Sequence, residues 1–365
     1  MLSEIIRQRI GEEGPVSFHD FMEMCLYYPK YGYYTSLKDK IGMNGDFYTS
    51  SSICSVFGAM IGRQLEEMWT LTGKKEFTIV EYGAGTGMLC HDILDYLKAG
   101  STLYSCLNYC IIEKSPVLQE QQKKCLQEKV SWCNSIDDIA GITGCILSNE
   151  VIDNFSVYQV VMKDELMEVF VDYKDSFYEV LKPARQELID YFSELNVTLP
   201  KDFRTEINLE AIEWIKGIAG CLKKGYLLTI DYGFPSSELY SVRRRNGTLL
   251  CYHGHTINYQ FYNNIGEQDI TSHINFSALS HWGSKNGLVP SGFINQASFM
   301  VNLGWQDYLN KILLQHCDSY MKFRQYSFLK YTMLLDMGQK LNILIQHKGV
   351  PDKRLKGVRY NSACL

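Results

Sequence analysis

Short apolar runs alternate with stretches of helically spaced apolar residues from about Phe77 onward. Repeated alternation of a strand with a crossover helix is typical of a parallel sheet covered by helices. The predicted fold class is therefore α/β, a Rossmann-like sheet with helices on both faces. Six runs are predicted as its strands: FTIVEY from Phe77, LNYCIIE from Leu107, KVSW from Lys129, GCILSN from Gly144, YLLTIDYG from Tyr226 and, as a late edge strand, LNILIQHK from Leu341.

Three further strand-like runs, YQVVMKD, LMEVFVDY and SFYEVL, interrupt this alternation between Tyr158 and Leu181. Short strands joined by tight turns predict an antiparallel meander, inserted after the fourth strand of the sheet. Helical spacing follows over 183–195 and 207–222, and a proline opens the first of these helices. The insert, about 158–215, is predicted to shape a wall of the substrate site.

Composition and charge exclude several classes of protein. With 365 residues, of which 46% are hydrophobic, the chain is long and apolar enough to bury a large core. Its net charge is −5, and the only dense basic run is the triplet Arg243–Arg245, so no nucleic-acid partner is expected. No apolar run approaches membrane-spanning length, so no membrane insertion is expected either.

The cysteines and the N-terminal segment bear on location. Twelve cysteines lie scattered through apolar segments without any C-x-x-C pair, and Cys106 and Cys110 are the nearest in sequence. This is typical of reduced thiols rather than of a zinc site or a disulfide framework. The start, MLSEIIRQRIGEEG, carries acidic residues within an apolar helical stripe, unlike a signal or transit peptide. The expected location is cytoplasmic, most simply in a bacterium.

The strongest motif is EYGAGTG, residues 81–87, which ends the strand from Phe77 and opens the helical stretch Met88–Leu97. Glycines at such a turn let the backbone approach a ligand, and the helix start behind them offers free N–H groups. The dinucleotide pattern G-x-G-x-x-G would need glycine at Met88, and no G-K-[ST] follows. The G-x-G-x-G spacing instead favours S-adenosylmethionine, with an ordinary strand-to-helix turn as the alternative.

Two carboxylates flank this loop. Glu113 closes the second strand, where a carboxylate accepts both ribose hydroxyls of a nucleoside without a 2′-phosphate. Glu113 alone is equally compatible with a surface acid, but together with the glycine loop its position becomes more specific. Glu81 is placed to meet the ammonium group of the cofactor.

The acceptor side is predicted from the geometry of open α/β sheets, in which the reacting ligand lies beyond the carboxyl ends of the strands. This nominates 148–153 and 231–233. Methyl transfer from a sulfonium depends mainly on alignment, and carboxylates there suit a guanidinium acceptor. Glu150 and Asp153 are the first candidates; capping and turn formation are their alternative roles.

A third polar segment, 266–276, follows the sequence CYHGH. The histidines and the aspartate of these two segments are residue types that can bind a metal. Methyl transfer needs no metal, however, and a sequence does not show the convergence that a metal site requires. A polar substrate cleft is favoured and no metal is predicted. The residues concerned are His253, His255, His273 and Asp269.

Two nucleic-acid methyltransferase signatures are absent. No two prolines are adjacent, so the tetrapeptide [DN]-P-P-[YF] does not occur, and no Pro-Cys pair is present. These absences argue against base amino-methylation and against cytosine C5 chemistry.

Taken together and in this order, the motifs resemble those of the MidA family of methyltransferases, found in bacteria and mitochondria. The resemblance implies a class I methyltransferase fold with an added substrate-covering region, S-adenosylmethionine as cofactor and a protein arginine as acceptor. Mitochondrial relatives are linked to assembly of respiratory complex I. The matching segments are Gly14–Phe18, Leu26–Tyr34, Gly45–Thr49, Phe57–Gly58, the glycine loop, Glu113–Pro116, Ser148–Glu150, Asp231–Gly233, Gly247–Leu249, Asp269–His273 and Gln296–Phe299.

The resemblance also implies a domain organisation and, together with the motifs described above, completes the set of predicted site residues. Residues 1–75 are expected to form a helical extension that covers the cofactor pocket, and 76–365 the methyltransferase domain. The predicted cofactor-binding residues are Asp46, Glu81, Gly83, Gly85, Gly87, Glu113 and Asn149. The predicted catalytic residues are Glu150, Asp153, Asp231 and His273, and the predicted substrate-binding residues are Tyr232, Asp269 and Thr271.

Three positions depart from the family pattern. Ala84 stands where the family has proline, Asp153 begins D-N-F-S where the family continues to D-A-L-P, and Asn275 replaces an aspartate before phenylalanine. Two of the three lie on the predicted substrate side. Two alternatives to arginine methylation therefore stay open: a small-molecule or lipid methyltransferase, and a non-catalytic assembly chaperone on the same fold.

Overall fold

The chain crosses five times between two units in the computed structural model. The first unit consists of Met1–Phe47, Ile152–Trp214 and Gly233–His281. The second consists of Tyr48–Val151, Ile215–Tyr232 and Trp282–Leu365. The structure describes residues 1–36, 46, 53–126, 129–139, 141–316, 319–351 and 354–359.

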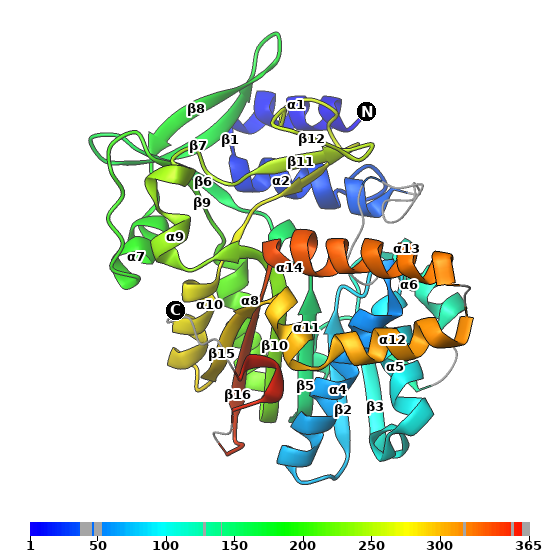
Figure 1. Cartoon of the computed structure of the whole chain (residues 1–365). Coiled ribbons are helices and arrows are strands. Elements are labelled where there is room, and N and C mark those ends of the chain that lie inside the picture. Colours follow the sequence, from blue (N-terminus) through cyan, green and yellow to red (C-terminus); the bar gives the residue numbers. More distant parts are fainter. Residues whose placement is uncertain are drawn as a thin grey trace. The chain divides into compact units, whose positions relative to one another are not determined.

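The second unit is built on a mainly parallel sheet (Figure 1). Strands β10, β5, β2, β3 and β4 lie in this order and run parallel, and β16 and then β15 extend the sheet antiparallel beyond β10. This confirms the predicted α/β class. The bounds are β2 Phe77–Tyr82, β3 Leu107–Ile112, β4 Val130–Cys133, β5 Ile142–Asn149, β10 Leu222–Phe234, β15 Val289–Asn295 and β16 Leu341–Lys348.

Helices cover both faces of this sheet. On one face α4 and α5 pack apolar side chains against alternate strand residues such as Leu228 and Ile230. Each fully buried large apolar side chain there contributes about 1.5–3 kcal/mol. On the other face Gly283 of α10 lies so close to Gln346 that a Cβ would meet the Nε2 atom at 2.3 Å. The helices are α4 Ser55–Thr72, α5 Met88–Gly100, α6 Pro116–Cys125, α8 Leu209–Cys221, α10 Phe276–Lys285, α11 Gln296–Asn302, α12 Trp305–His316, α13 Ser319–Lys330 and α14 Met337–Lys340.

One strand prediction is wrong in its position. β16 has the predicted residues but lies between β10 and β15, so it is not an edge strand. The edge strand is β15, whose sequence VPSGFIN contains a proline and a glycine that interrupt the apolar pattern expected of a strand. Its register against β16 shifts between Pro290 and Gly292, and such a bulge lets an edge strand accommodate both residues.

The first unit contains a five-stranded antiparallel sheet with the order β1-β7-β6-β9, in which β8 also pairs with β7. The pairs β6 with β7 and β7 with β8 confirm the predicted meander. β1 pairs with β7 and β9 pairs with β6, so the sheet also contains two strands from outside the predicted meander. The bounds are β1 Val16–Ser17, β6 Tyr158–Met162, β7 Leu166–Tyr173, β8 Phe177–Pro183 and β9 Arg204–Ile207.

The rest of the first unit consists of helices and a small sheet. α1 (Leu2–Glu13) and α2 (Phe18–Tyr27) pack on one face of the five-stranded sheet, where Phe18, Phe21 and Met22 are fully buried. Pro183 ends β8 rather than opening the following helix, α7, which spans Gln186–Glu194. The three-stranded sheet has the order β12-β11-β13, and β14 pairs with the end of β10. The bounds are α9 Ser236–Leu239, β11 Leu250–His253, β12 Thr256–Asn258, β13 Asp269–Thr271 and β14 Ile274–Asn275.

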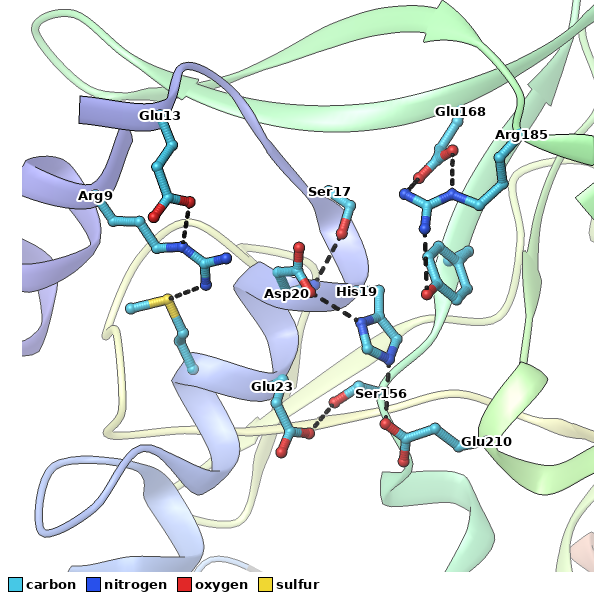
Figure 2. A network of polar contacts seen from close by, with 12 residues as sticks. Arg9, Glu13, Ser17, His19, Asp20, Glu23, Ser156, Glu168, Arg185 and Glu210 are labelled. Atoms are coloured by element: carbon cyan, nitrogen blue, oxygen red, sulfur yellow. Dashed lines mark hydrogen bonds and ion pairs between the residues drawn. The ribbon is translucent and has the colours of Figure 1, made fainter. Parts of the chain in front are cut away.

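A polar network fastens α2 to the five-stranded sheet (Figure 2). His19 lies between Asp20 and Glu210, with nitrogen-to-oxygen distances of 3.3 and 3.1 Å, and its ring stacks on Tyr158. Burial alone would lower the pKa of His19, but the two carboxylate hydrogen bonds outweigh it and raise the pKa to about 9. His19 is therefore a cation at neutral pH that links α2 to Glu210, a residue of the same unit.

The two units divide the chain differently from the predicted boundary at residue 75. α4 packs into the core of the parallel-sheet unit, whereas the insert at about 158–215 lies mostly in the same unit as residues 1–47. The expectation that residues 1–75 cover the cofactor pocket stays a prediction.

Candidate functional site

The glycine loop joins β2 to α5 with a backbone that favours glycine. Gly83, Gly85 and Gly87 have φ values of 59°, 53° and 84°, in the left-handed region. A Cβ on Gly83 would lie 3.0 Å from Val151 Cγ2, and Gly87 is the N-cap of α5. The loop therefore presents backbone, rather than side chains, at a helix start whose N–H groups suit an anionic ligand group.

Glu113 lies directly after β3 and is held beside this loop. Its Oε1 atom accepts a hydrogen bond from the Ser115 N–H at 2.9 Å. Its Oε2 atom accepts one at 3.1 Å from the Nε2 of Gln122, which also donates to the Gly85 carbonyl at 2.8 Å. Burial raises the pKa of Glu113, and these hydrogen bonds oppose that effect by favouring the carboxylate. Sequence reasoning missed Gln122; a polar residue on the inward side of the helix from Pro116 was the available signal.

Glu81 is a buried acid at the end of β2, with 2% of its surface exposed. The Tyr109 hydroxyl donates to its Oε2 atom at 2.7 Å. Burial raises the pKa of Glu81 to about 7, although the Tyr109 hydrogen bond acts in the opposite direction. A cation next to Glu81 would favour its charged form.

The segment after β5 brings three predicted residues together. Glu150 has a left-handed φ of 54°, uncommon for a residue other than glycine, and its N–H donates to the Ile230 carbonyl at 2.9 Å. The next N–H, of Val151, donates to Asp231 Oδ2 at 3.2 Å. The Asn149 side chain donates to Glu150 Oε1 at 3.3 Å. The carboxyl ends of β5 and β10 therefore hold Asn149, Glu150 and Asp231 within one small region.

Five other predicted residues belong to the first unit, and one of them, Asp269, is a second buried acid. Asp269, the first residue of β13, accepts hydrogen bonds from the Tyr34 hydroxyl at 3.0 Å and from Asn154 Nδ2 at 3.3 Å. Burial raises the pKa of Asp269 to about 7. Asp153 is buried, and its carbonyl accepts the Ser272 N–H. Asp46 binds the Tyr33 hydroxyl and the Gly254 N–H, and Thr271 is buried within β13.

His273 and Tyr232 complete the predicted set. The backbone N–H of His273 donates to Thr248 Oγ1, and its ring lies 5.2 Å from that of Phe234. Burial, followed by the positive charge of Arg244, lowers the pKa of His273 to about 4. His273 is therefore neutral at pH 7. Tyr232, in the second unit, follows Asp231 in β10 and is partly exposed.

The described residues contain no group of three or more His, Cys, Asp or Glu side chains arranged to hold a metal ion. Within the same part of the chain, no helix has both the length and the apolar character needed to cross a membrane.

The donor set fits S-adenosylmethionine. A glycine loop at a helix start suits the carboxylate of an amino-acid moiety, a carboxylate after the second strand suits ribose hydroxyls, and a buried acid between them suits an ammonium group. One further polar atom points the same way: Asn149 Oδ1 is buried and has no hydrogen-bond partner among the described residues.

Comparison with known proteins supports this assignment. The profile of a family described as "Putative S-adenosyl-L-methionine-dependent methyltransferase" matches residues 60–294. The mitochondrial protein arginine methyltransferases NDUFAF7 of Bos taurus and Homo sapiens are 27% and 28% identical to this chain. Their alignments cover 98% and 96% of this chain and 85% and 84% of the relatives.

A solved structure agrees over the whole chain. It is the crystal structure of a "likely methyl transferase from Burkholderia thailandensis bound to S-adenosyl-homocysteine", with a TM-score of 0.89 and 26% identity. The match covers 100% of this chain and 95% of that one. The fold is thus that of a class I methyltransferase with an inserted antiparallel sheet, and the chain belongs to the MidA family of S-adenosylmethionine-dependent methyltransferases.

Proposed function

We propose that this methyltransferase transfers a methyl group to an arginine side chain of a protein. The observation that carries the proposal is Glu150, a carboxylate at the carboxyl end of β5 whose left-handed backbone is held by Ile230 and, through Val151, by Asp231. A non-glycine residue in this conformation persists only where its surroundings enforce it, and such residues cluster at functional sites. The names of the mitochondrial relatives support the same acceptor.

The cofactor half of the proposed site binds and orients. Gly83, Gly85 and Gly87 present the backbone to the amino-acid moiety, Glu81 meets the ammonium group and Glu113 accepts the ribose hydroxyls. When bound, S-adenosylmethionine supplies a methyl carbon on a sulfonium whose bond to carbon breaks with its electron pair going to sulfur. Asn149, with its buried Oδ1 atom, is assigned to the same half.

The acceptor half aligns a guanidinium. Glu150 accepts hydrogen bonds from the N–H groups of the guanidinium and directs one nitrogen toward the methyl carbon. As that nitrogen bonds to the methyl carbon it releases one N–H proton to water, so the product keeps a single positive charge, which the Glu150 carboxylate stabilises. Asp231 acts through the backbone of Val151 and is a positioning residue in this scheme. Because His273 is neutral at pH 7, it would serve as a hydrogen-bonding group and not as a proton donor. Asp153, Tyr232, Asp269 and Thr271 remain proposed members of this half.

The test is methyl transfer from radiolabelled S-adenosylmethionine to a cell extract of the source organism, followed by acid hydrolysis and separation of methylated amino acids. We expect labelled methylarginine from protein. The Glu150→Gln variant should lose at least a hundredfold in rate while S-adenosylhomocysteine binds as before, and Glu194→Gln, in α7 on the first unit, should change neither. Label confined to small molecules or lipids would overturn the proposal, as would an active Glu150→Gln variant.

The identity of the acceptor protein is a further step. By resemblance to the MidA family, the acceptor would take part in assembly of respiratory complex I. The predicted cytoplasmic location stays a prediction, and the relatives named above are mitochondrial. A glutamine at Glu150 or a valine at Gly85 that leaves complex I assembly intact in cells would favour the assembly-chaperone alternative.

A further inference from the structure

Gln122 is a fully buried polar side chain in the second turn of α6. Its amide joins three segments that are far apart in sequence. Nε2 donates to the Gly85 carbonyl at 2.8 Å and to Glu113 Oε2 at 3.1 Å, and Oε1 accepts the Trp132 indole N–H at 2.9 Å. The amide orientation is fixed by these partners, because an indole N–H only donates and a carbonyl only accepts.

The contacts of Glu113 and of the Gln122 stem close this arrangement. Glu113 Oε1 accepts the N–H of Ser115, and the Ser115 hydroxyl in turn caps α6 by accepting the Leu118 N–H. The Cγ atom of Gln122 lies 3.5 Å from the position of a Cβ built on Gly87. One side chain thus sets the spacing between the glycine loop, the carboxylate after β3 and the strand β4.

We propose that Gln122 is a positioning residue that holds Glu113 in the orientation and ionised state needed to accept the ribose hydroxyls of the cofactor. The inference rests on the cofactor half of the proposed function. A hydrogen bond from an amide to a partly buried carboxylate favours its charged form, and a charged carboxylate is the better acceptor for hydroxyl groups. Loss of the amide would leave the Glu113 carboxylate and the Gly85 carbonyl, both partly buried, without that partner, so the effect should reach ligand binding.

The test compares two ligands on four proteins by isothermal titration. The ligands are S-adenosylhomocysteine and its 2′,3′-dideoxy analogue, which lacks the ribose hydroxyls. The proteins are the wild type, Gln122→Met, which keeps the volume and removes both polar atoms, Trp132→Phe, which removes only the indole donor, and the matched control Gln119→Met. Gln119 is on the same helix, and Lys123 donates to its side chain.

We expect Gln122→Met to weaken S-adenosylhomocysteine binding on the order of tenfold or more, which corresponds to about 1.4 kcal/mol per tenfold, and to change binding of the dideoxy analogue much less. Trp132→Phe should shift the same ratio by a few-fold, and Gln119→Met should leave it unchanged. In a Glu113→Gln background, Gln122→Met should add little further loss, because both substitutions remove one interaction.

Equal weakening of both ligands would overturn the inference, because it would mean that Gln122 only supports the fold. Unchanged binding in Gln122→Met would overturn it as well. If Gln122→Met fails to fold, the ratio measured for Trp132→Phe decides the outcome. The proposed cofactor site fails separately: it is wrong if Gly85→Val and Glu113→Gln leave S-adenosylhomocysteine binding unchanged. If those two variants lose binding and Gln122→Met and Trp132→Phe do not, only the role of Gln122 is wrong.

Discussion

Two buried acids, one in each unit, have pKa values that burial raises to the same level, but different kinds of segment supply their hydrogen-bond partners. Glu81 and Asp269 are each 2% exposed, and burial raises the pKa of both to about 7. Glu81 belongs to a strand in the middle of the parallel sheet and has the hydroxyl of Tyr109, on the neighbouring strand, as its partner. Asp269 is held by Tyr34 and Asn154, which come from short irregular or 3₁₀ segments.

This difference explains why the cofactor half of the proposed site was easier to predict from the sequence than the surroundings of Asp269. In an open α/β sheet the ligand lies at the carboxyl ends of the strands. A carboxylate at the end of a predicted strand can therefore be placed beside the ligand from the sequence alone. In the other unit, the neighbours of Asp269 depend on segments more than a hundred residues away. We therefore expect a cation bound at the cofactor loop to favour the ionised form of Glu81 and to leave Asp269 unaffected.

The largest expected effect concerns the glycine loop. Gly85→Val places a β-branched side chain on a backbone with φ of 53°, which such residues adopt only under strain. We expect S-adenosylmethionine binding to weaken more than a hundredfold by isothermal titration. Gly100→Val is the matched control, because a Cβ there meets nothing within 4 Å. Equal loss in both variants would show that the effect is one of folding and not of the loop.

The next effect separates the two acids by pH. Each raised pKa means that the ligand-free protein takes up a proton on folding, so stability falls as pH rises from the ordinary value, 4.5 for Glu81 and 3.8 for Asp269, to about 7. Glu81→Gln and Asp269→Asn should each remove on the order of 3 kcal/mol of this loss, measured by urea unfolding at pH 4 and pH 8.

S-adenosylmethionine sharpens the same comparison. Its ammonium group should favour the ionised form of Glu81. At saturating cofactor, the part of the pH dependence of unfolding free energy that is due to Glu81 should disappear, and the part that is due to Asp269 should remain. An identical response of both acids to the cofactor would contradict the assignment of Glu81 to the ammonium group.

The smallest expected effect tests the first unit alone. Because the pKa of His19 is raised to about 9, the stabilisation that it contributes is fully present below its ordinary pKa of about 6.5 and is lost as pH rises through 9. His19→Gln should cost on the order of 1–2 kcal/mol at pH 6, after allowance for solvent screening, and much less at pH 10. Urea unfolding at both pH values measures this, with exposed His253→Gln as control. A pH-independent cost would mean that His19 acts through packing on Tyr158 alone.

Much of the fold was predictable because the relevant information is local. Strands such as β2 and β16 are short runs centred on consecutive apolar residues and are mostly buried, and their residues were predicted correctly. β15 was missed because Pro290 and Gly292 break its pattern, and its pairing with β16 is what makes it a strand. Because β15 was missed, β16 was wrongly predicted to lie at the edge of the sheet.

The candidate site divides along the same line. The sequence by itself determined the glycine loop, the carboxylates that flank it and the family, because these depend on residue type and spacing over a few positions. Only the tertiary structure decided that Gln122 joins Gly85 to Glu113, that Asp231 fixes the turn at Glu150, and that burial brings the pKa of Glu81 and of Asp269 to about 7. Hydrogen-bond partners and desolvation are properties of how distant segments pack, and no local pattern encodes them.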